Sequence, residues 1–99
     1  MDFSTNRADG VATLRIEGEL DAVSIPEVRP TIETLIAERH PQIVVDLSGL
    51  RLIDSSGVGA LVFLYKKAKE YGGSVTVRGL RDQPLSIFKL LRLDRVLIV

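Results

Sequence analysis

The sequence predicts an α/β fold: a single domain with a mixed, mostly parallel sheet of about five strands and three main helices. Two observations lead to this prediction. Short apolar runs typical of strands alternate with longer runs of helical spacing, and residues typical of turns or helix ends separate them. Such alternation favours a layered fold in which consecutive strands run parallel. The 99 residues, 45% of them hydrophobic, suffice for one core, so one domain over residues 1–99 is expected.

The chain begins with a predicted β-hairpin. Residues 2–7 form a weak first strand, and the Asp-Gly pair at 9–10 is a turn signal before a better strand over residues 11–17. Alternating side chains in the second strand predict one buried face and one face in contact with water. The Gly-Glu-Leu-Asp segment at 18–21 is expected to end this strand as a polar turn with one buried leucine.

The first predicted helix starts with a capping-box pattern, in which Ser24 is the N-cap and Glu27 follows three residues later. Apolar residues then keep helical spacing until Pro41 ends the helix, and Pro30 predicts a kink or an irregular first turn. Residues 42–47 form a nearly continuous apolar run, which is typical of a strand covered on both faces.

The second half of the chain repeats the alternation. A helix is predicted from the serines after Asp54 to the glycine pair at 72–73, which would form its C-terminal end. Residues 74–78 read as a strand. A third, short helix is predicted from Asp82 to about Leu91, and residues 94–99 are expected to form a last strand.

Composition excludes several classes of protein. Lys and Arg together number 13, as do Asp and Glu, so there is no basic excess for general nucleic-acid binding. The chain has no cysteine, and His40 is its only histidine, so neither a metal nor a cofactor is expected. No apolar run could cross a bilayer, and the N-terminal residues do not resemble a signal peptide. We therefore expect a cytoplasmic protein without a membrane partner.

Four polar or small residues, Asp54, Ser55, Ser56 and Gly57, stand where an apolar strand meets the second helix. A helix N-terminus has unsatisfied N–H groups and attracts anions. Asp and Ser are also preferred N-cap residues, and local chemistry alone favours a simple cap over a functional site.

One side of the second helix has an unusual composition. Helical spacing puts Gly59, Phe63 and Lys66 opposite Leu61 and Tyr65, on the side that leads back to the serine pair. A contact with a partner would explain a phenylalanine there. A single exposed apolar residue is also commonplace, and the spacing does not decide between the two.

Several motifs together resemble the STAS domain family, and more narrowly the bacterial anti-sigma factor antagonists. They are Gly-Glu-Leu-Asp at 18–21, Val-Val-Asp-Leu at 44–47, Asp-Ser-Ser-Gly at 54–57 and Gly-Gly at 72–73. The similarity covers almost the whole chain, including the order of the elements and the turn at 92–94. It implies a STAS-like fold and a phosphoprotein that regulates transcription by switching partners.

The resemblance also implies a site. Ser55, the hydroxyl directly after the aspartate, would be the phosphoacceptor. The implied partners are an anti-sigma factor that is a serine kinase and a phosphatase that acts on the phosphorylated form. The unphosphorylated form would bind the anti-sigma factor and release its target, and phosphate on Ser55 would block that binding. The expected partner-binding surface consists of Asp21, Asp54, Ser55, Ser56, Gly57, Gly59 and Phe63, of which Phe63 comes from helical spacing and not from the family.

The sequence supports three other functions to different degrees. An enzyme is not expected, because Ser55 has no candidate base and its surroundings are not G-x-S-x-G. A STAS subunit that docks permanently on a partner such as a lipid-transport ATPase would use the same helix surface. A phosphate site for a small anion or nucleotide is weakly indicated, because Gly57 and Gly59 lack the third glycine of a dinucleotide motif.

Overall fold

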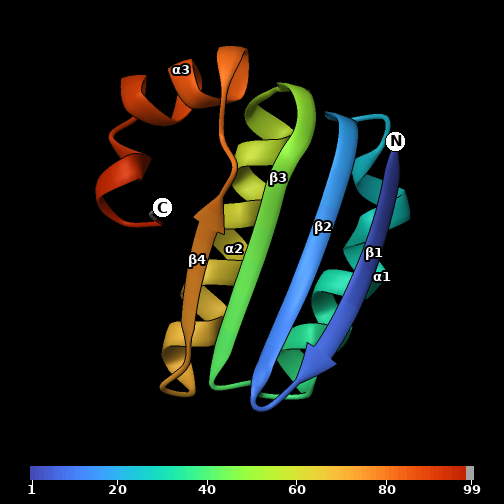
Figure 1. Cartoon of the computed structure of the whole chain (residues 1–99), viewed down its shortest axis with the longest axis vertical. Helices are drawn as coiled ribbons and strands as arrows, with labels where there is room; N and C mark the ends of the chain where they lie inside the picture. Colours follow the sequence, from blue (N-terminus) through green and yellow to red (C-terminus); the bar gives the residue numbers. More distant parts are fainter. Residues whose placement is uncertain (98–99) are drawn as a thin grey trace.

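Four strands form one mixed sheet in the computed structural model, which describes residues 1–97 (Figure 1). The strands are β1 (Asp2–Ala8), β2 (Val11–Leu20), β3 (Gln42–Ile53) and β4 (Ser74–Arg78), and they are ordered β1-β2-β3-β4 in the sheet. β1 pairs antiparallel with β2, whereas the β2–β3 and β3–β4 pairs are parallel. The prediction of a mixed, mostly parallel sheet is confirmed.

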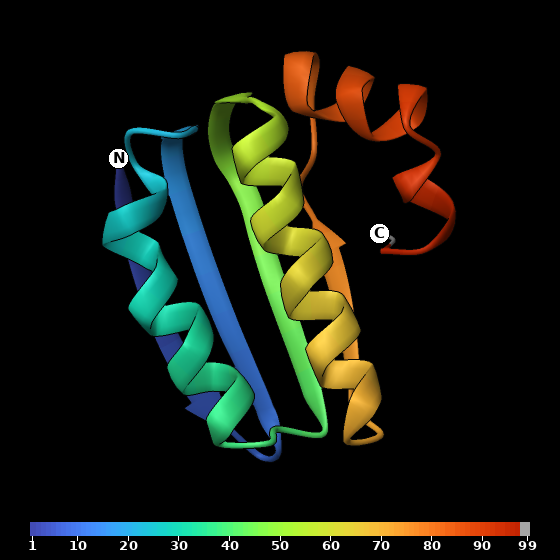
Figure 2. The same cartoon turned by 180° about the vertical axis from the view of Figure 1, so that it is seen from behind.

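Two long helices, α1 (Ile25–Ala37) and α2 (Ser55–Glu70), lie side by side on one face of this sheet (Figure 2). Both begin at the end where the parallel strands finish. The shorter α3 (Asp82–Leu90) crosses that end and is followed by a 3₁₀ turn, η1 (Leu93–Arg95). None of the described helices is both long and apolar enough to cross a membrane.

The hydrophobic core lies between the sheet and these two helices. In β2 the alternation predicted for residues 11–17 is confirmed, because Ala12, Leu14 and Ile16 are fully buried and the residues between them are not. Burial of one such large aliphatic side chain contributes roughly 1.5–3 kcal/mol to folding. The fully or almost fully buried core residues include Leu14 and Ile16 of β2, Ile32 and Leu35 of α1, Leu61 and Leu64 of α2, and Phe88 of α3.

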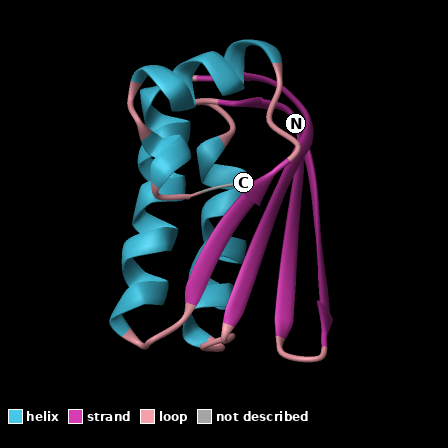
Figure 3. Ribbon diagram, turned by 60° about the vertical axis from the view of Figure 1, so that its left-hand side comes forward, coloured by secondary structure: helices cyan, strands magenta, loops and turns pink. Residues whose placement is uncertain are grey.

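The other face of the sheet is open (Figure 3). In β3, Ile43 and Val45 are fully buried, but Val44 and Asp46, which alternate with them, are only half-buried. The prediction that this strand is covered on both faces is therefore wrong. Both long helices pack on the same side, so an apolar run in the sequence does not produce a strand buried on two sides.

Two strands are longer than predicted. β2 continues through residues 18–20, and β3 runs without interruption through Ser48 and Gly49 to Ile53. Register shifts between the two strands absorb the irregular stretch, and Gly18 takes a positive φ of 94°. The predicted turn at 18–21 is wrong for these three residues, because β3 supplies a parallel partner for them. Leu20 is fully buried, as expected.

α1 begins where it was predicted, but not for the predicted reason. The Ser24 side chain makes no cap bond, so the capping box with Glu27 does not form. The helix passes through Pro30 and ends at Ala37, before the predicted end near Pro41. Arg39 adopts a positive φ of 54°, which stops the helix at that point.

The predicted last strand is not found in the described residues. α3 starts at Asp82 as expected, and Arg92, with a φ of 60°, ends it and turns the chain into η1. Within residues 1–97, the segment after α3 is joined to β4 by a backbone hydrogen bond from Val77 N–H to the Leu97 carbonyl at 2.7 Å. The sheet of the described chain thus has four strands instead of about five, and the last two residues of the predicted strand, 98–99, are outside the described part of the chain.

Candidate functional site

Asp54 is the N-cap of α2. Its backbone is extended, with φ −112° and ψ −174°, and its Oδ1 accepts a hydrogen bond from Gly57 N–H at 3.0 Å. A short side chain directly before a helix reaches such an N–H group, which would otherwise lack a partner. The cap predicted from the sequence is therefore correct for Asp54.

The second carboxylate oxygen of Asp54 holds a different segment. Its Oδ2 accepts a hydrogen bond from Ala22 N–H at 3.1 Å, and Asp54 N–H donates to the Leu20 carbonyl at 3.2 Å. One side chain thus fixes the start of α2 and the loop between β2 and α1 to each other, although the two segments are 32 residues apart.

That loop is also fixed internally. Asp21 Oδ1 accepts hydrogen bonds from Val23 N–H at 3.1 Å and Ser24 N–H at 2.9 Å. The Ser24 hydroxyl donates to the Glu19 carbonyl at 2.9 Å and accepts from Asp21 N–H at 3.0 Å. The Ser24 N–H is the main reason that the pKa of the Asp21 carboxyl lies below its usual value. Asp21 is therefore a structural carboxylate that faces the same end of the sheet as the serine pair.

Ser55 and Ser56 differ from these groups because both are exposed. Neither hydroxyl takes part in the side-chain hydrogen bonds found among residues 1–97. Ser56 lines a surface hollow of about 440 Å³ together with residues of α1 that include Pro26 and Arg29. Both hydroxyls are accessible to a reagent or a partner.

Two glycines of α2 have opposite surroundings. A Cβ on Gly57 would contact the Leu20 carbonyl oxygen and lie 2.7 Å from Ile53 Cγ1, so a side chain does not fit there. A Cβ on Gly59 would have no neighbour within 4 Å, and Gly59 is exposed. Packing within the chain therefore requires glycine at 57 and does not require it at 59.

Phe63 lies on the exposed side of α2, as helical spacing predicted, and 38% of its surface is accessible. Of the two residues predicted on the opposite side, Leu61 is buried and Tyr65 is half-buried. The Lys67 ammonium is 5.7 Å from the Phe63 ring centroid, which is within the range of a cation–π interaction. A partner contact at Phe63 stays a prediction.

Sequence reasoning missed Val23 and Leu52. Val23 is 85% exposed, in the loop that the Asp21 and Asp54 carboxylates hold in place, and Leu52 is exposed near the end of β3. The available signal for Val23 was an apolar residue in a polar loop, directly after Asp21 and Ala22. Its exposure next to the site could not be read from local spacing.

The remaining polar clusters do not suggest a metal centre. The described residues contain no group of three or more His, Asp or Glu side chains arranged to hold an ion. His40, just beyond α1, has its Nε2 2.7 Å from Glu38 Oε1, which also accepts a bond from Arg7. His40 thus has a structural partner near the helix end.

Comparison with known proteins agrees with the fold and the motifs. The family described as "Mlab, STAS domain" matches residues 3–99. The anti-sigma-B factor antagonist of Bacillus subtilis (strain 168) is 29% identical over 97 residues, which cover 98% of this chain and 86% of that protein.

Solved structures give the same result. An anti-sigma factor antagonist from Mycobacterium paratuberculosis has a TM-score of 0.83 at 27% identity, covering 95% of this chain and 80% of that one. The anti-sigma factor antagonist SpoIIAA has TM-scores of 0.79 in its unphosphorylated form and 0.80 in its phosphorylated form, at 20% and 21% identity. These alignments cover 99% of this chain and 87% and 89% of the SpoIIAA chains. The resemblance inferred from the motifs is confirmed: the chain belongs to the STAS domain family.

Proposed function

We propose that this protein is an anti-sigma factor antagonist, and that phosphorylation of Ser55 switches its binding. The unphosphorylated form binds an anti-sigma factor that is also a serine kinase, and so releases the kinase's target. Phosphate on Ser55 blocks this complex, and a phosphatase restores it. The observation that carries the proposal is an exposed Ser55 hydroxyl beside Asp54, whose two oxygens are already engaged with Gly57 and Ala22.

The physical chemistry of the site favours a switch that leaves the fold intact. A phosphate adds about −1.5 to −2 charges and three acceptor oxygens. Negative charge at a helix N-terminus is favourable by roughly 0.3–1 kcal/mol, so the start of α2 tolerates it. Asp54 stays in its cap, because the hydroxyl of Ser55 takes no part in that hydrogen bond.

The same change is unfavourable for a complex. A partner that packs over a neutral hydroxyl meets instead a bulky dianion, next to the carboxylates of Asp21 and Asp54. Binding then falls because of steric exclusion and like-charge repulsion at the interface. The surface involved consists of Asp21, Asp54, Ser55, Ser56, Gly57, Gly59 and Phe63, to which we add the exposed Val23.

The relatives support this function. Those compared above carry the name anti-sigma factor antagonist, which describes regulators that bind and not enzymes. SpoIIAA has been solved in both phosphorylation states, and the two forms match this fold almost equally well. We also propose that the protein acts in the cytoplasm, through a protein partner and without contact with DNA.

Phosphate transfer tests the assignment of Ser55. The chain is incubated with the serine kinase from its source organism and ATP, and the modified residue is located by mass spectrometry. We expect Ser55→Ala to abolish incorporation and the matched control Ser56→Ala to retain most of it. The reverse pattern would assign the switch to Ser56, and no incorporation into the unaltered chain would reject phosphorylation altogether.

Ser55→Asp tests the consequence for binding. The variant should lose at least tenfold in affinity for the anti-sigma factor, about 1.4 kcal/mol, while its melting temperature moves by only a few degrees. Unchanged affinity together with a collapsed melting temperature would show that Ser55 is a structural residue.

A second function is favoured by one observation, the family description "Mlab". In that case the chain is a STAS subunit that docks permanently on a partner such as a lipid-transport ATPase, through the same surface. Purification from its own cells distinguishes the two proposals. Permanent docking predicts co-purification with an ATP-binding transporter subunit whatever the phosphorylation state, whereas the switch predicts a kinase partner that leaves when Ser55 is modified.

A further inference from the structure

The carboxyl-terminal part of the described chain carries a patch that is both apolar and basic. Three large apolar side chains there have exposed fractions of 76%, 52% and 47%, and three basic side chains are exposed beside them. The patch, called the α3 patch below, consists of Leu90, Leu91 and Val96 with Lys89, Arg92 and Arg95.

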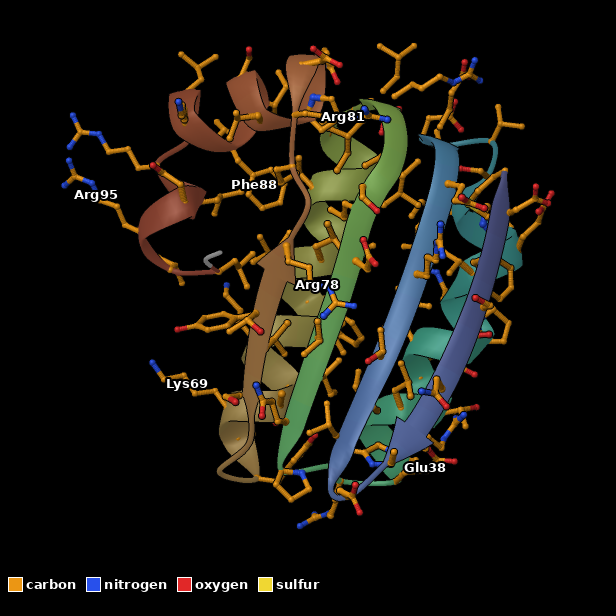
Figure 4. The ribbon with its side chains drawn as sticks, viewed as in Figure 1. Glu38, Lys69, Arg78, Arg81, Phe88 and Arg95 are labelled. Carbon is orange, nitrogen blue, oxygen red and sulfur yellow. The ribbon has the colours of Figure 1, made fainter. Side chains whose placement is uncertain are left out.

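The α3 patch is held in a fixed orientation. Phe88 and Leu97, on either side of the patch, are buried. At the start of α3, the Gln83 side chain accepts a hydrogen bond from Ile53 N–H and donates one to the Ile53 carbonyl, both at 2.9 Å. Arg92 adopts a left-handed backbone conformation, with φ 60°, which folds η1 back beside α3. Figure 4 shows Phe88 pointing toward the sheet and Arg95 pointing away from it. The exposed leucines are thus a stable feature of the surface.

The charge of this segment is positive. Residues 89–96 contain three basic side chains and one acidic side chain, the half-buried Asp94, which gives a local formal charge of +2. The whole chain has a formal net charge of zero, so the α3 patch is a local departure from neutrality. A complementary partner must be negative and must also accept apolar side chains.

The shape of the patch favours a lipid surface over a protein. Leu90, at 76% exposure, projects from the domain, so a protein partner would have to supply a matching hollow. The interface of a bilayer accepts projecting apolar side chains at the acyl boundary, while anionic headgroups pair with Lys and Arg. Long basic side chains can reach the headgroups from beside a buried leucine.

We propose that the α3 patch binds the surface of an anionic lipid bilayer, and that the protein can be a peripheral membrane protein as well as a soluble one. The expectation of no membrane partner rested on the lack of a spanning segment, and it does not extend to this patch. The proposal is independent of the role of Ser55.

Sedimentation with vesicles tests it. The purified chain is mixed with vesicles of phosphatidylcholine alone, or of phosphatidylcholine with about a third phosphatidylglycerol, an anionic lipid. We expect binding to the anionic vesicles only, and a decrease of about tenfold or more when the salt concentration is raised from low to high, because salt screens exposed charges.

Matched variants assign the binding to the patch. Lys89→Glu with Arg95→Glu should reduce it about tenfold or more, whereas Lys66→Glu with Lys69→Glu, the same change of charge on exposed α2 residues, should not. Leu90→Ser with Leu91→Ser should also release the protein, whereas Val23→Ser, a change at another exposed apolar residue, should not. Circular dichroism of each variant checks that the fold is kept.

Three results would overturn the proposal. The first is equal or absent binding to the two kinds of vesicle. The second is an equal loss in the test and control variants, which would indicate general charge attraction. The third is concentration-dependent dimerisation that Leu90→Ser abolishes, without vesicle binding, which would assign the patch to a second copy of the chain.

Discussion

The starts of α1 and α2 use the same device with opposite results. Each helix follows a parallel strand at the same end of the sheet, and in each an aspartate accepts the N–H of the residue three positions later. Asp21 accepts from Ser24 at 2.9 Å, and Asp54 accepts from Gly57 at 3.0 Å. Serines are present at both starts, but only those of α2 have free hydroxyls.

The offset from the aspartate decides this difference. Ser24, three residues after Asp21, points inward, is 8% exposed and uses its hydroxyl within the loop. Ser55 and Ser56, one and two residues after Asp54, point outward. A serine near a helix start is therefore structural or available for modification according to its position relative to the capping carboxylate. Four predictions test this comparison, from the largest expected effect to the smallest.

Among the variants that test the comparison itself, the largest effect is expected where the two starts touch. Gly57→Ala places a methyl group against the Leu20 carbonyl and Ile53, so the free energy of unfolding should fall by about 3 kcal/mol. Gly59→Ala is the matched control, because its methyl group has open space. It should stabilise the free domain by about 0.5–1 kcal/mol and weaken partner binding. Urea unfolding measures the stability of the two variants, and equal effects on stability would contradict the close approach at Gly57.

The second prediction tests whether the partner-binding surface of α2 extends from its serines to Phe63. Phe63→Ala should change the free energy of unfolding by no more than about 0.5 kcal/mol, because the ring is partly exposed. It should cost about 2 kcal/mol or more of partner binding if Phe63 is an aromatic anchor. Phe88→Ala, the buried counterpart, should cost roughly 3–5 kcal/mol of stability. Calorimetric titration with the partner gives the affinity. A stable Phe63→Ala variant that binds normally would limit the docking surface to the start of the helix.

The third prediction compares the serines directly. Ser24→Ala removes a hydroxyl that donates to the Glu19 carbonyl and accepts from Asp21 N–H, so it should cost about 1–2 kcal/mol of stability. Ser55→Ala removes a hydroxyl outside that network and should stay within about 0.5 kcal/mol. Thermal melting of the two variants under the same conditions is the measurement. A larger loss of stability in Ser55→Ala than in Ser24→Ala would contradict the difference between the two helix starts.

The smallest effect concerns acid stability. The pKa of Asp21 is lowered in the folded state, chiefly by the Ser24 N–H, so its contribution to stability is complete above the unfolded-state pKa. That contribution is lost as the pH falls through the folded-state value, which places the window below about pH 4. Asp21→Asn should therefore show a shallower decrease in stability between neutral pH and this window. Parallel pH profiles for the two proteins would contradict this assignment.

Much of the fold was predictable because it depends on neighbouring residues. The alternation around Leu14 determines which face of β2 is buried, and the helical spacing around Leu61 determines the exposure of Phe63. The strand over residues 74–78 and the end of α2 at the glycine pair were also predicted correctly. In each case the signal and the structure lie within a few positions of each other.

Tertiary structure decided the rest. The sequence alone could not show that Asp54 also holds Ala22, that Leu20 leaves no space for a side chain at Gly57, or that Val23 is exposed beside the serines. It predicted a capping box at Ser24, whose hydroxyl instead binds the preceding loop. The bond between Asp54 and Ala22 joins segments 32 residues apart. This bond and the close approach of Leu20 to Gly57 form only when β2 and β3 pair. Local spacing cannot specify them, because it does not contain the register of that pairing.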